Sequence, residues 1–500
     1  MGFNSILNWF DSSPIWSGLD ALATIVSFTA LIILMPFISK YFKIFNWLKK
    51  RYLISCSQDY IVVCGLGKNN RIYIDSELND NINNIIVIEQ NSNNIYLEEY
   101  RKRGVVVIIG DASNINILQY LNINKIKHIL VSVGNDISNL EIVTQILDIN
   151  LSTKVYVHME DRSLRHFHKE NGIFQSNNIK IFSYYEEASR ELFDKFDIDG
   201  NDKRLIDSSE NFSIAVIGNT NLSCEIIGQA CIMGQLPNEN KLTIYCIDKD
   251  ISEFKKFVEI NYTEINRVPN ITIEYIDLDV NSIAFYKSKI WHNNLTNIVI
   301  SLDDEQTNLD IASNLANITF LEQIVDNKLK TNIILAMFNS YNLSTKIKEN
   351  SMLFNNFNIF ADAKDICDKK WIINDLRDKK AILINDIYIK ENPEKAKEWD
   401  ELNYFEKESN RASADHIKIK QKYLSIHADD DAKELLAKCE HNRWNSFHFL
   451  NGYKYAKYNS SELKEQRAKK FHHCLTSYDT LSEEYKNYDR KIVEDVKDIF

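Results

Sequence analysis

The strongest constraint on the fold is an alternation of short apolar runs with longer helical stretches, and this alternation occurs twice. The first set of apolar runs occupies residues 60–64, 85–88, 105–109, 129–133 and 155–158. The second set occupies residues 213–217, 242–247, 271–276, 298–301, 333–337 and 359–361, about 155 residues later. Strands that alternate with helices of 10–20 residues form parallel, doubly wound sheets. The chain is therefore predicted to be an α/β protein with two tandem domains.

Small and acidic residues follow these runs at regular positions. Gly65 and Gly67 come directly after the first run, Glu89 ends the second, and Asp111 follows the third. Glycines let the backbone approach a phosphate at a helix N-terminus, and an acid after the second strand can hold ribose hydroxyls. Asp248 has the place of Glu89 in the second repeat. The pattern predicts a nucleotide-binding turn in the first domain and a related turn in the second.

The whole series, from Gly65-x-Gly67 through Glu89 and Asp111 to Asn135-Asp136, resembles the RCK N-terminal family over about residues 58–197. These Rossmann-like domains regulate potassium channels and Trk-type transporters. The resemblance implies that Gly65, Gly67, Glu89 and Asp111 contact NAD(H), ATP/ADP or a nucleotide second messenger.

Two features leave the nucleotide prediction open. Asn70 stands where the fingerprint has its third glycine, which weakens close pyrophosphate binding. The alternative is a degenerate core that is kept for dimerisation. Residues 211–377 read as a second RCK-like domain, with either a weaker nucleotide affinity or a structural role in pairing with the first.

A stretch without charges lies near the N-terminus. Residues 21–39 contain no charged side chain, and as a helix they would rise about 28 Å, enough to cross a bilayer. The basic residues of 40–57 follow this stretch, and none precede it. The positive-inside rule then predicts a single-pass inner-membrane protein with residues 1–20 outside and the domains in the cytoplasm. The alternative is a cleaved signal peptide, which would need a basic segment before the apolar run.

The C-terminal part changes character after a charged linker, residues 378–398, and residues 399–500 are predicted to be a small, mainly helical domain. Its segment 440–489 resembles the RyR domain, first named from ryanodine receptors. The resemblance is carried by the sequence Glu440-His441-Asn442-Arg443-Trp444, by Gly452-Tyr453, by His473 and by Tyr478-Asp479.

Four side chains of this segment and one from the preceding helix are candidate ligand contacts. They are Arg411, His441, Arg443, Trp444 and Tyr453. An arginine fork suits phosphate or carboxylate, and aromatic faces suit a planar ring. Arg443 is expected at the rim of a core formed by Trp444. The alternative is a helix-packing domain in which His441 and Arg443 make structural hydrogen bonds.

Composition removes several classes of function. The net charge of −11 argues against binding to nucleic acid. The eight cysteines contain no C-x-x-C pair, and neither His472-His473 nor His166-x-His168 has partners at metal-ligand spacing, so no metal site is predicted. No catalytic motif occurs, so the chain is predicted not to be an enzyme, and an NAD-dependent oxidoreductase is disfavoured.

Two functions remain. The first is a membrane-anchored, nucleotide-sensing regulator of potassium or other ion flux, acting as a homo-oligomer or on a channel or transporter pore subunit. The alternative is a nucleotide-activated, membrane-disrupting effector of an antiphage or CRISPR-type defence system, because one span without a selectivity filter could form a leak only by oligomerising.

Overall fold

The computed structural model describes most of the chain from Asp59 onward. The described residues are 50, 59–80, 82, 84–121, 123–150, 152–171, 178–200, 205, 208–326, 331–349, 357–373, 378–391, 393, 396–427, 429–457, 466 and 468–495. The chain divides into two compact units. The first comprises residues up to Leu66 with 82–130 and 144–153, and the second comprises 67–81, 131–143 and all residues from Lys154.

The first sheet has six strands in the order β3-β2-β1-β4-β5-β6. Its strands are β1 (Tyr60–Cys64), β2 (Ile85–Glu89), β3 (Val106–Ile109), β4 (Ile126–Val131), β5 (Val155–His158) and β6 (Ile179–Phe182). Its helices are α3 (Lys68–Asn79), α4 (Leu97–Lys102), α5 (Ile115–Tyr120), α6 (Asp136–Ile149), α7 (Arg162–Asn171) and α8 (Tyr184–Lys195). Strands β1 and β2 are buried along their whole length, as expected for a parallel sheet covered on both faces.

The second sheet also has six strands, in the order β12-β11-β10-β7-β8-β9. Its strands are β7 (Phe212–Ile217), β8 (Leu242–Asp248), β9 (Ile271–Asp277), β10 (Leu295–Ile300), β11 (Asn332–Ala336) and β12 (Asn358–Phe360). Its helices are α10 (Asn221–Met233), α11 (Ile251–Asn261), α12 (Ile283–Tyr286), α13 (Glu305–Asp326) and α14 (Tyr341–Glu349). After β12 the chain forms the short helices α15 (Ala363–Ile366) and α16 (Lys369–Ile372), which contact helices of the first domain. Counted within each domain, both sheets follow the order 3-2-1-4-5-6 of dinucleotide-binding folds. The prediction of two doubly wound parallel sheets is confirmed.

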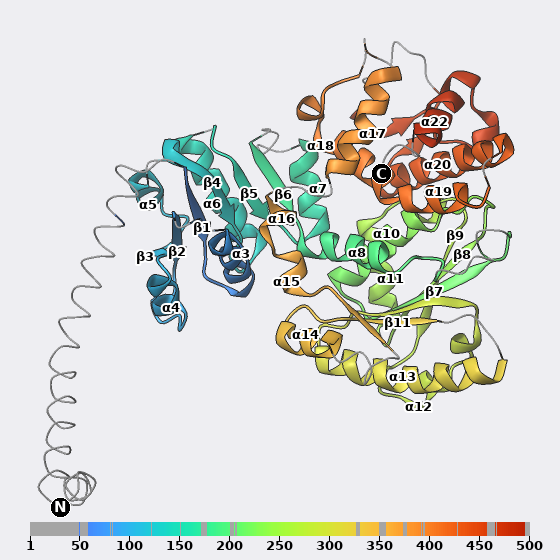
Figure 1. The fold of residues 1–500 in the computed structure, drawn as a ribbon, viewed down its shortest axis with the longest axis horizontal. Coiled ribbons are helices and arrows are strands. Elements are labelled where there is room, and N and C mark those ends of the chain that lie inside the picture. Colours follow the sequence, from blue (N-terminus) through green and yellow to red (C-terminus); the bar gives the residue numbers. More distant parts are fainter. Residues whose placement is uncertain are drawn as a thin grey trace, which may run out of the picture. The chain divides into compact units, whose positions relative to one another are not determined.

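A helical layer completes the second unit. It contains α17 (Asp378–Glu391), α18 (Tyr404–Asp415), α19 (Ile417–Leu424), α20 (Asp430–Leu450) and α22 (Glu483–Asp495), with the short strands β13 (Lys454–Tyr455) and β14 (Phe471–His472). Asn403 and Glu406 form a capping box that fixes the start of α18. Helix α20 packs against α10, α18 and α22 (Figure 1).

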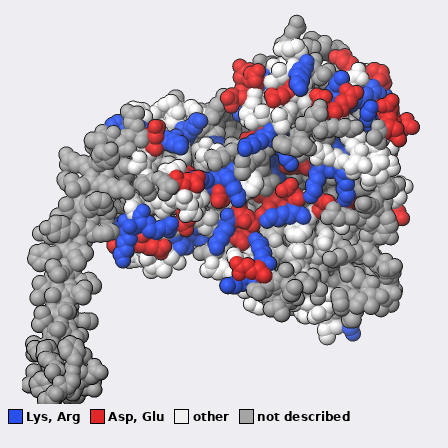
Figure 2. Space-filling model, in the orientation of Figure 1, with Lys and Arg blue, Asp and Glu red and all other residues white. Residues whose placement is uncertain are grey.

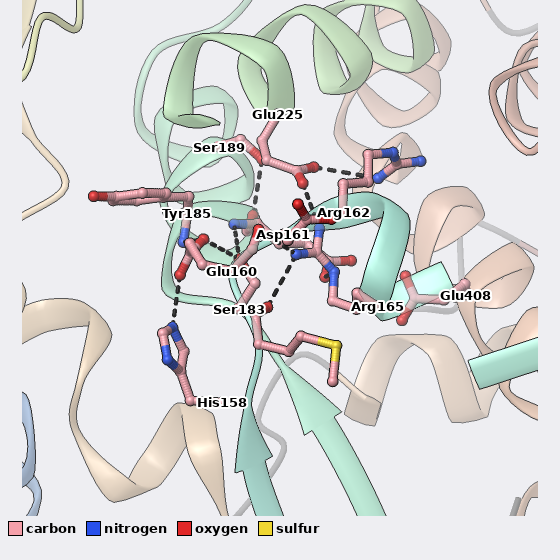
Figure 3. A network of polar contacts seen from close by, with 12 residues as sticks. His158, Glu160, Asp161, Arg162, Arg165, Ser183, Tyr185, Ser189, Glu225 and Glu408 are labelled. Carbon is pink, nitrogen blue, oxygen red and sulfur yellow. Dashed lines mark hydrogen bonds and ion pairs between the residues drawn. The ribbon is translucent and has the colours of Figure 1, made fainter. Parts of the chain in front are cut away.

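A buried polar network joins α7 and α8 of the first sheet to α10 of the second (Figure 3). Glu225 on α10 forms ion pairs with Arg165 and with Arg162, the latter at 3.3 Å. Glu186 on α8 lies 3.4 Å from Arg165. Because α8 and α10 also pack directly on each other, the contact contains both apolar and charged parts.

At the surface, basic and acidic side chains are intermixed over the visible face (Figure 2).

The prediction of a membrane-spanning helix is corrected. Among the residues that the structure describes, no helix is long and apolar enough to cross a bilayer. The apolar stretch 21–39, its flanks 1–20 and most of the basic segment 40–57 lie outside the described residues. The fold assigned here is therefore the α/β part with its helical layer. The prediction of a single-pass inner-membrane protein with its N-terminus outside is withdrawn with the helix.

Candidate functional site

The predicted turn after β1 is formed as a tight loop braced by Glu89. Gly65 has a φ of 92°, a conformation that only glycine adopts without strain. Its N–H donates to the carbonyl of Ile88 at 2.7 Å. The Leu66 N–H donates to Glu89 Oε2 at 2.7 Å, and the Asn91 N–H donates to Oε1 at 2.7 Å. The carboxylate at the end of β2 therefore holds the loop at the end of β1.

Gly67 ends this loop as the N-cap of α3. Its side-chain position is open, since a Cβ placed there would meet no atom within 4 Å. No side chain caps the first turn of α3. Asn70, at the third fingerprint position, points inward and donates to the Ser132 carbonyl at 2.9 Å. Asn70 is thus part of the packing and not of the surface that a phosphate would approach.

Asp111 lies at the same end of the sheet as Gly65 and Glu89. It follows β3, which pairs with β2, and the Gly110 N–H donates to the Glu89 carbonyl at 3.0 Å. Its side chain is exposed and accepts hydrogen bonds from Ser113 N at 2.9 Å and Ser113 Oγ at 2.8 Å. The structure therefore brings Gly65, Glu89 and Asp111 to the carboxyl ends of three adjacent strands.

The second domain repeats the same turn with different contents. Gly218 has a φ of 107°, and the Asn219 N–H donates to Asp248 Oδ2 at 3.0 Å. Asp248 Oδ1 also accepts from the Asp250 N–H at 2.8 Å. Asp248 and Glu89 therefore stabilise their turns in the same way, by accepting a hydrogen bond from a backbone N–H of the turn.

Hydroxyl groups fill the space beside the second turn. Thr220, in the place of Gly67, donates to the Ser301 carbonyl at 2.8 Å and accepts from Ser223 N at 3.1 Å. The Ser223 and Ser301 hydroxyls are 2.8 Å apart. A Cβ on Gly218 would lie 3.1 Å from Leu302. The first turn is open at Gly67, whereas the second is closed by side chains.

Arg443 and Trp444 have environments opposite to those expected from the sequence. Arg443 is fully buried and donates to Glu440 Oε1 at 2.6 Å, while Lys420 Nζ lies 2.6 Å from Glu440 Oε2. Trp444 is only half-buried. Burial raises the pKa of Glu440, but Arg443 and Lys420 outweigh it, so its pKa lies below its usual range. The internal acid makes a buried arginine tolerable.

Arg411 is also held by acids. Its Nε and Nη2 donate to the two oxygens of Asp378 at 2.5 and 2.6 Å, and its Nη1 donates to Glu408 at 2.5 Å. The described contacts do not bring Arg411 and Arg443 together as a two-arginine clamp. His441 hydrogen-bonds to the Thr476 carbonyl at 2.9 Å through Nε2.

Four of the five predicted C-terminal residues line one large cavity of about 1310 Å³ in the second unit. These are Arg411, His441, Trp444 and Tyr453. The cavity is also lined by residues that the sequence analysis did not single out, notably Lys180 of β6 and Phe405 and Lys407 of α18. The run Ile179-Lys180-Ile181-Phe182 could have been read as a sixth strand, but nothing in the sequence indicates that its lysine faces helices more than 200 residues later.

One group of three metal-type ligands occurs within the described residues. The ligand atoms of His472, His473 and Cys474 all lie within 4.8 Å of one another. His472 Nδ1 accepts from the Cys474 N–H at 3.1 Å, and His473 Nε2 lies 2.9 Å from the Tyr485 hydroxyl. These bonds give both imidazoles structural partners, and the prediction of no metal site stays a prediction.

Comparison with solved structures finds distant likenesses to a channel protein, GsuK. GsuK bound to ADP shares 14% sequence identity at a TM-score of 0.40, covering 71% of this chain and 81% of that chain. The GsuK channel bound to NAD shares 12% identity at a TM-score of 0.44, covering 76% of this chain and 77% of that chain.

Two sequence comparisons match only a part of the chain. An uncharacterized protein from Methanothermus fervidus is 26% identical over 102 residues, which is 20% of this chain and 16% of that protein. The chain thus spans about a sixth of that relative's length. Residues 61–178 match the TrkA-N domain family, and this match confirms the RCK N-terminal prediction for the part of the first sheet from β1 to β5.

Proposed function

We propose that this protein is a nucleotide-sensing regulator of the RCK type that controls potassium or other ion flux. The observation that carries the proposal is the position of Glu89. It lies inside the segment that matches the TrkA-N domain, at the end of β2, and bonds to the backbone of the Gly-x-Gly loop. This is the place where nucleotide-binding folds hold ribose hydroxyls.

The Glu89 carboxylate retains capacity for a ribose. Its described bonds come from Leu66 N, Asn91 N and the Asn94 amide, the last at 3.2 Å. A carboxylate has about four acceptor positions. The open side of Gly67 leaves the α3 N-terminus accessible to a phosphate. An adenine nucleotide, either NAD(H) or ATP/ADP, is the ligand class whose ribose suits a carboxylate at the end of β2.

The second turn is proposed to be structural. Thr220, Ser223 and Ser301 occupy with hydrogen bonds the region that is open at Gly67. Asp248 then braces the fold and does not bind ligand. The chain then has one nucleotide-binding turn. The second domain, paired with the first, transmits the presence or absence of nucleotide to an oligomer or to a separate pore subunit. The C-terminal layer is proposed to be a domain of the RyR type.

Binding to the purified full-length chain tests the proposal. Loss of a charge-assisted contact worth about 1.5–3 kcal/mol predicts that Glu89→Ala weakens NADH, ATP or ADP by about tenfold or more. Asp248→Ala is the matched control, because it removes the equivalent brace from the closed turn, and it should leave that affinity unchanged. Equal affinities in wild type and Glu89→Ala would contradict the nucleotide assignment of this turn.

Ion flux provides the second measurement. Cells that express the chain should change their potassium uptake or efflux relative to cells with an empty vector. Glu89→Ala should shift the response to the cellular nucleotide level without changing the amount of protein. Identical flux with and without the chain would contradict the regulatory part of the proposal.

A further inference from the structure

The large cavity of the second unit is composite. One wall is the edge of the first sheet, where Tyr156 of β5 and Lys180 of β6 contribute side chains. The other walls come from α17, α18, α20 and the loops that follow α20. The volume of about 1310 Å³ exceeds that of a typical small-molecule site, about 300–1,000 Å³. A ligand here would touch parts of the chain that are more than 250 residues apart in sequence.

Aromatic rings gather on the α18 and α20 side of this cavity. Phe405 and Tyr453 are stacked, with centroids 5.0 Å apart and an interplanar angle of 29°. Trp444 lies 3.8 Å from the His448 ring and is stacked with His441 at 5.7 Å. Trp444 is half-buried and borders the cavity. The exposed parts of the Trp444 and Tyr453 rings are available for contact with a planar ligand group.

Cationic groups gather nearby on β6 and α18. Lys180 and Lys407 are both half-buried and both line the cavity with Arg411. Arg411 is engaged by Asp378 and Glu408. The Lys180 ammonium donates to a carbonyl, that of Ile372, at 3.1 Å, and Lys407 lies over the Trp399 ring at 5.6 Å.

Burial and the neighbouring Arg411 both lower the pKa values of the two lysines. Burial lowers the pKa of Lys180 to about 8, and Arg411 lowers it further, against the attraction of Asp378, Glu187 and Glu408. Burial and then Arg411 also lower the pKa of Lys407. The cavity is also lined by the acids Asp378, Asp400 and Glu406. Burial disfavours the charged forms of the two lysines, and an anion bound beside them would favour those forms.

We propose that this cavity is a second nucleotide site, in which Trp444 and Tyr453 contact the base and Lys180 and Lys407 bind the phosphates. The assignment goes beyond the turn at Glu89, because none of its residues belongs to that turn. Arg411 stays paired with Asp378 and acts on the two lysines only through its charge, which lowers their pKa values. Arg443 is fully buried against Glu440 of the same helix, α20, and is not a ligand contact. Occupancy would link the edge of the first sheet to the C-terminal helices.

ATP binding to full-length Glu89→Ala protein tests this site independently of the first turn. Calorimetry should show residual ATP binding, and adding Lys180→Met or Trp444→Leu should weaken it by about tenfold or more. Lys256→Met, an exposed lysine of α11, is the matched control and should change nothing. Thermal melts establish that each variant folds. Absence of ATP binding to the Glu89→Ala chain at millimolar concentration, or unchanged binding in folded Lys180→Met, would overturn the proposal.

Two further arms identify the ligand chemistry. Pyrophosphate should bind the Glu89→Ala chain at least tenfold more weakly than ATP, because it lacks a ring; equal affinity would overturn the role of Trp444 and Tyr453. At pH 8 ATP binding should take up protons, since an anion raises the pKa of Lys180 from about 8. Titrations in buffers of different ionisation enthalpy measure this uptake, and Lys180→Met should abolish it. Failure of the Glu89 turn would appear differently, as equal binding by wild type and Glu89→Ala.

Discussion

The guanidinium of Arg443 and the carboxylate of Glu440 lie 2.6 Å apart on successive turns of α20, and both side chains are completely buried. Lys420 of α19 approaches the other carboxylate oxygen, Oε2, at 2.6 Å. The Ser413 hydroxyl of α18 donates to Oε1, the oxygen that Arg443 contacts, at 3.0 Å. One acid thus connects three helices of the C-terminal layer. The sequence pair Glu440-x-x-Arg443 is a buried contact in the core of this layer, whereas the neighbouring Trp444 is half-buried and lines the large cavity.

The first prediction is that Glu440→Gln destabilises this layer by about 3–5 kcal/mol, because it leaves Arg443 and Lys420 buried without their anion. Hydrogen exchange of the α20 amides measures the local loss. Glu434→Gln on the same helix is the control, since its pair with Arg490 is solvent-exposed and such pairs contribute about 0.2–1 kcal/mol. Equal protection of α20 in both variants would show that the buried pair contributes no more than the exposed one.

The second prediction concerns His416 and acid. Burial lowers the pKa of His416 to about 3, with Lys420 adding to the effect, and its Nε2 bonds to the Gln235 carbonyl at 2.8 Å. The unfolded chain binds a proton at this residue below about pH 6.5 while the folded chain does not. The free energy of unfolding should therefore fall as pH drops from about 6.5, with a slope approaching 1.4 kcal/mol per pH unit, about the value for one proton.

His416→Gln keeps a donor for the Gln235 carbonyl and should flatten this slope. Denaturant titrations between pH 5 and 7 separate it from Glu440, whose depressed pKa makes stability fall only below the ordinary glutamate range, near pH 4.5. His427→Gln controls for the loss of an imidazole. An unchanged slope in His416→Gln would assign the acid sensitivity to another group.

The sheets could be predicted from sequence because apolar runs of three to six residues, separated by helices, leave few alternative folds. Eleven of the twelve strands follow from these runs. The missing one, β6, is an edge strand whose short apolar run is interrupted by Lys180. The Glu89 and Asp248 turns were also predictable, since an acid after the second strand has a fixed place in this topology. The environments of Arg443 and Trp444 were not, because helical periodicity does not reveal which partner neutralises a buried charge.

The third prediction concerns Gly228 in the middle of α10. A Cβ at this position would lie 2.5 Å from Tyr262 Cζ, and Tyr262 is fully buried. Gly228→Ala should gain about 1 kcal/mol of helix propensity but lose about 1–3 kcal/mol to overpacking, so the melting temperature falls. Adding Tyr262→Leu should reduce the loss. Gly134→Ala, which has open space, is the control, and a stabilised Gly228→Ala would contradict the close packing of α10 on Tyr262.

The last prediction concerns the junction between the two sheets. Glu225 of α10 is buried and pairs with Arg165 and Arg162 of α7, so it joins the second domain to an element of the first (Figure 3). Glu225→Gln should remove the anion beside the half-buried Arg162 and leave the buried Arg165 with Glu186 at 3.4 Å, at a cost of about 3–5 kcal/mol. The variant should lose hydrogen-exchange protection in α7 and α10 together, because these helices share the acid. Glu253→Gln removes an exposed acid of α11 as the matched control.

A double variant provides a second test. Replacing Arg165 with methionine and Glu225 with leucine together should cost less than Glu225→Gln alone, because the buried guanidinium is removed with its anion and only the half-buried Arg162 loses a partner. Loss confined to α10 would mean that the two domains are held together by the apolar contact of α8 with α10 and not by this network.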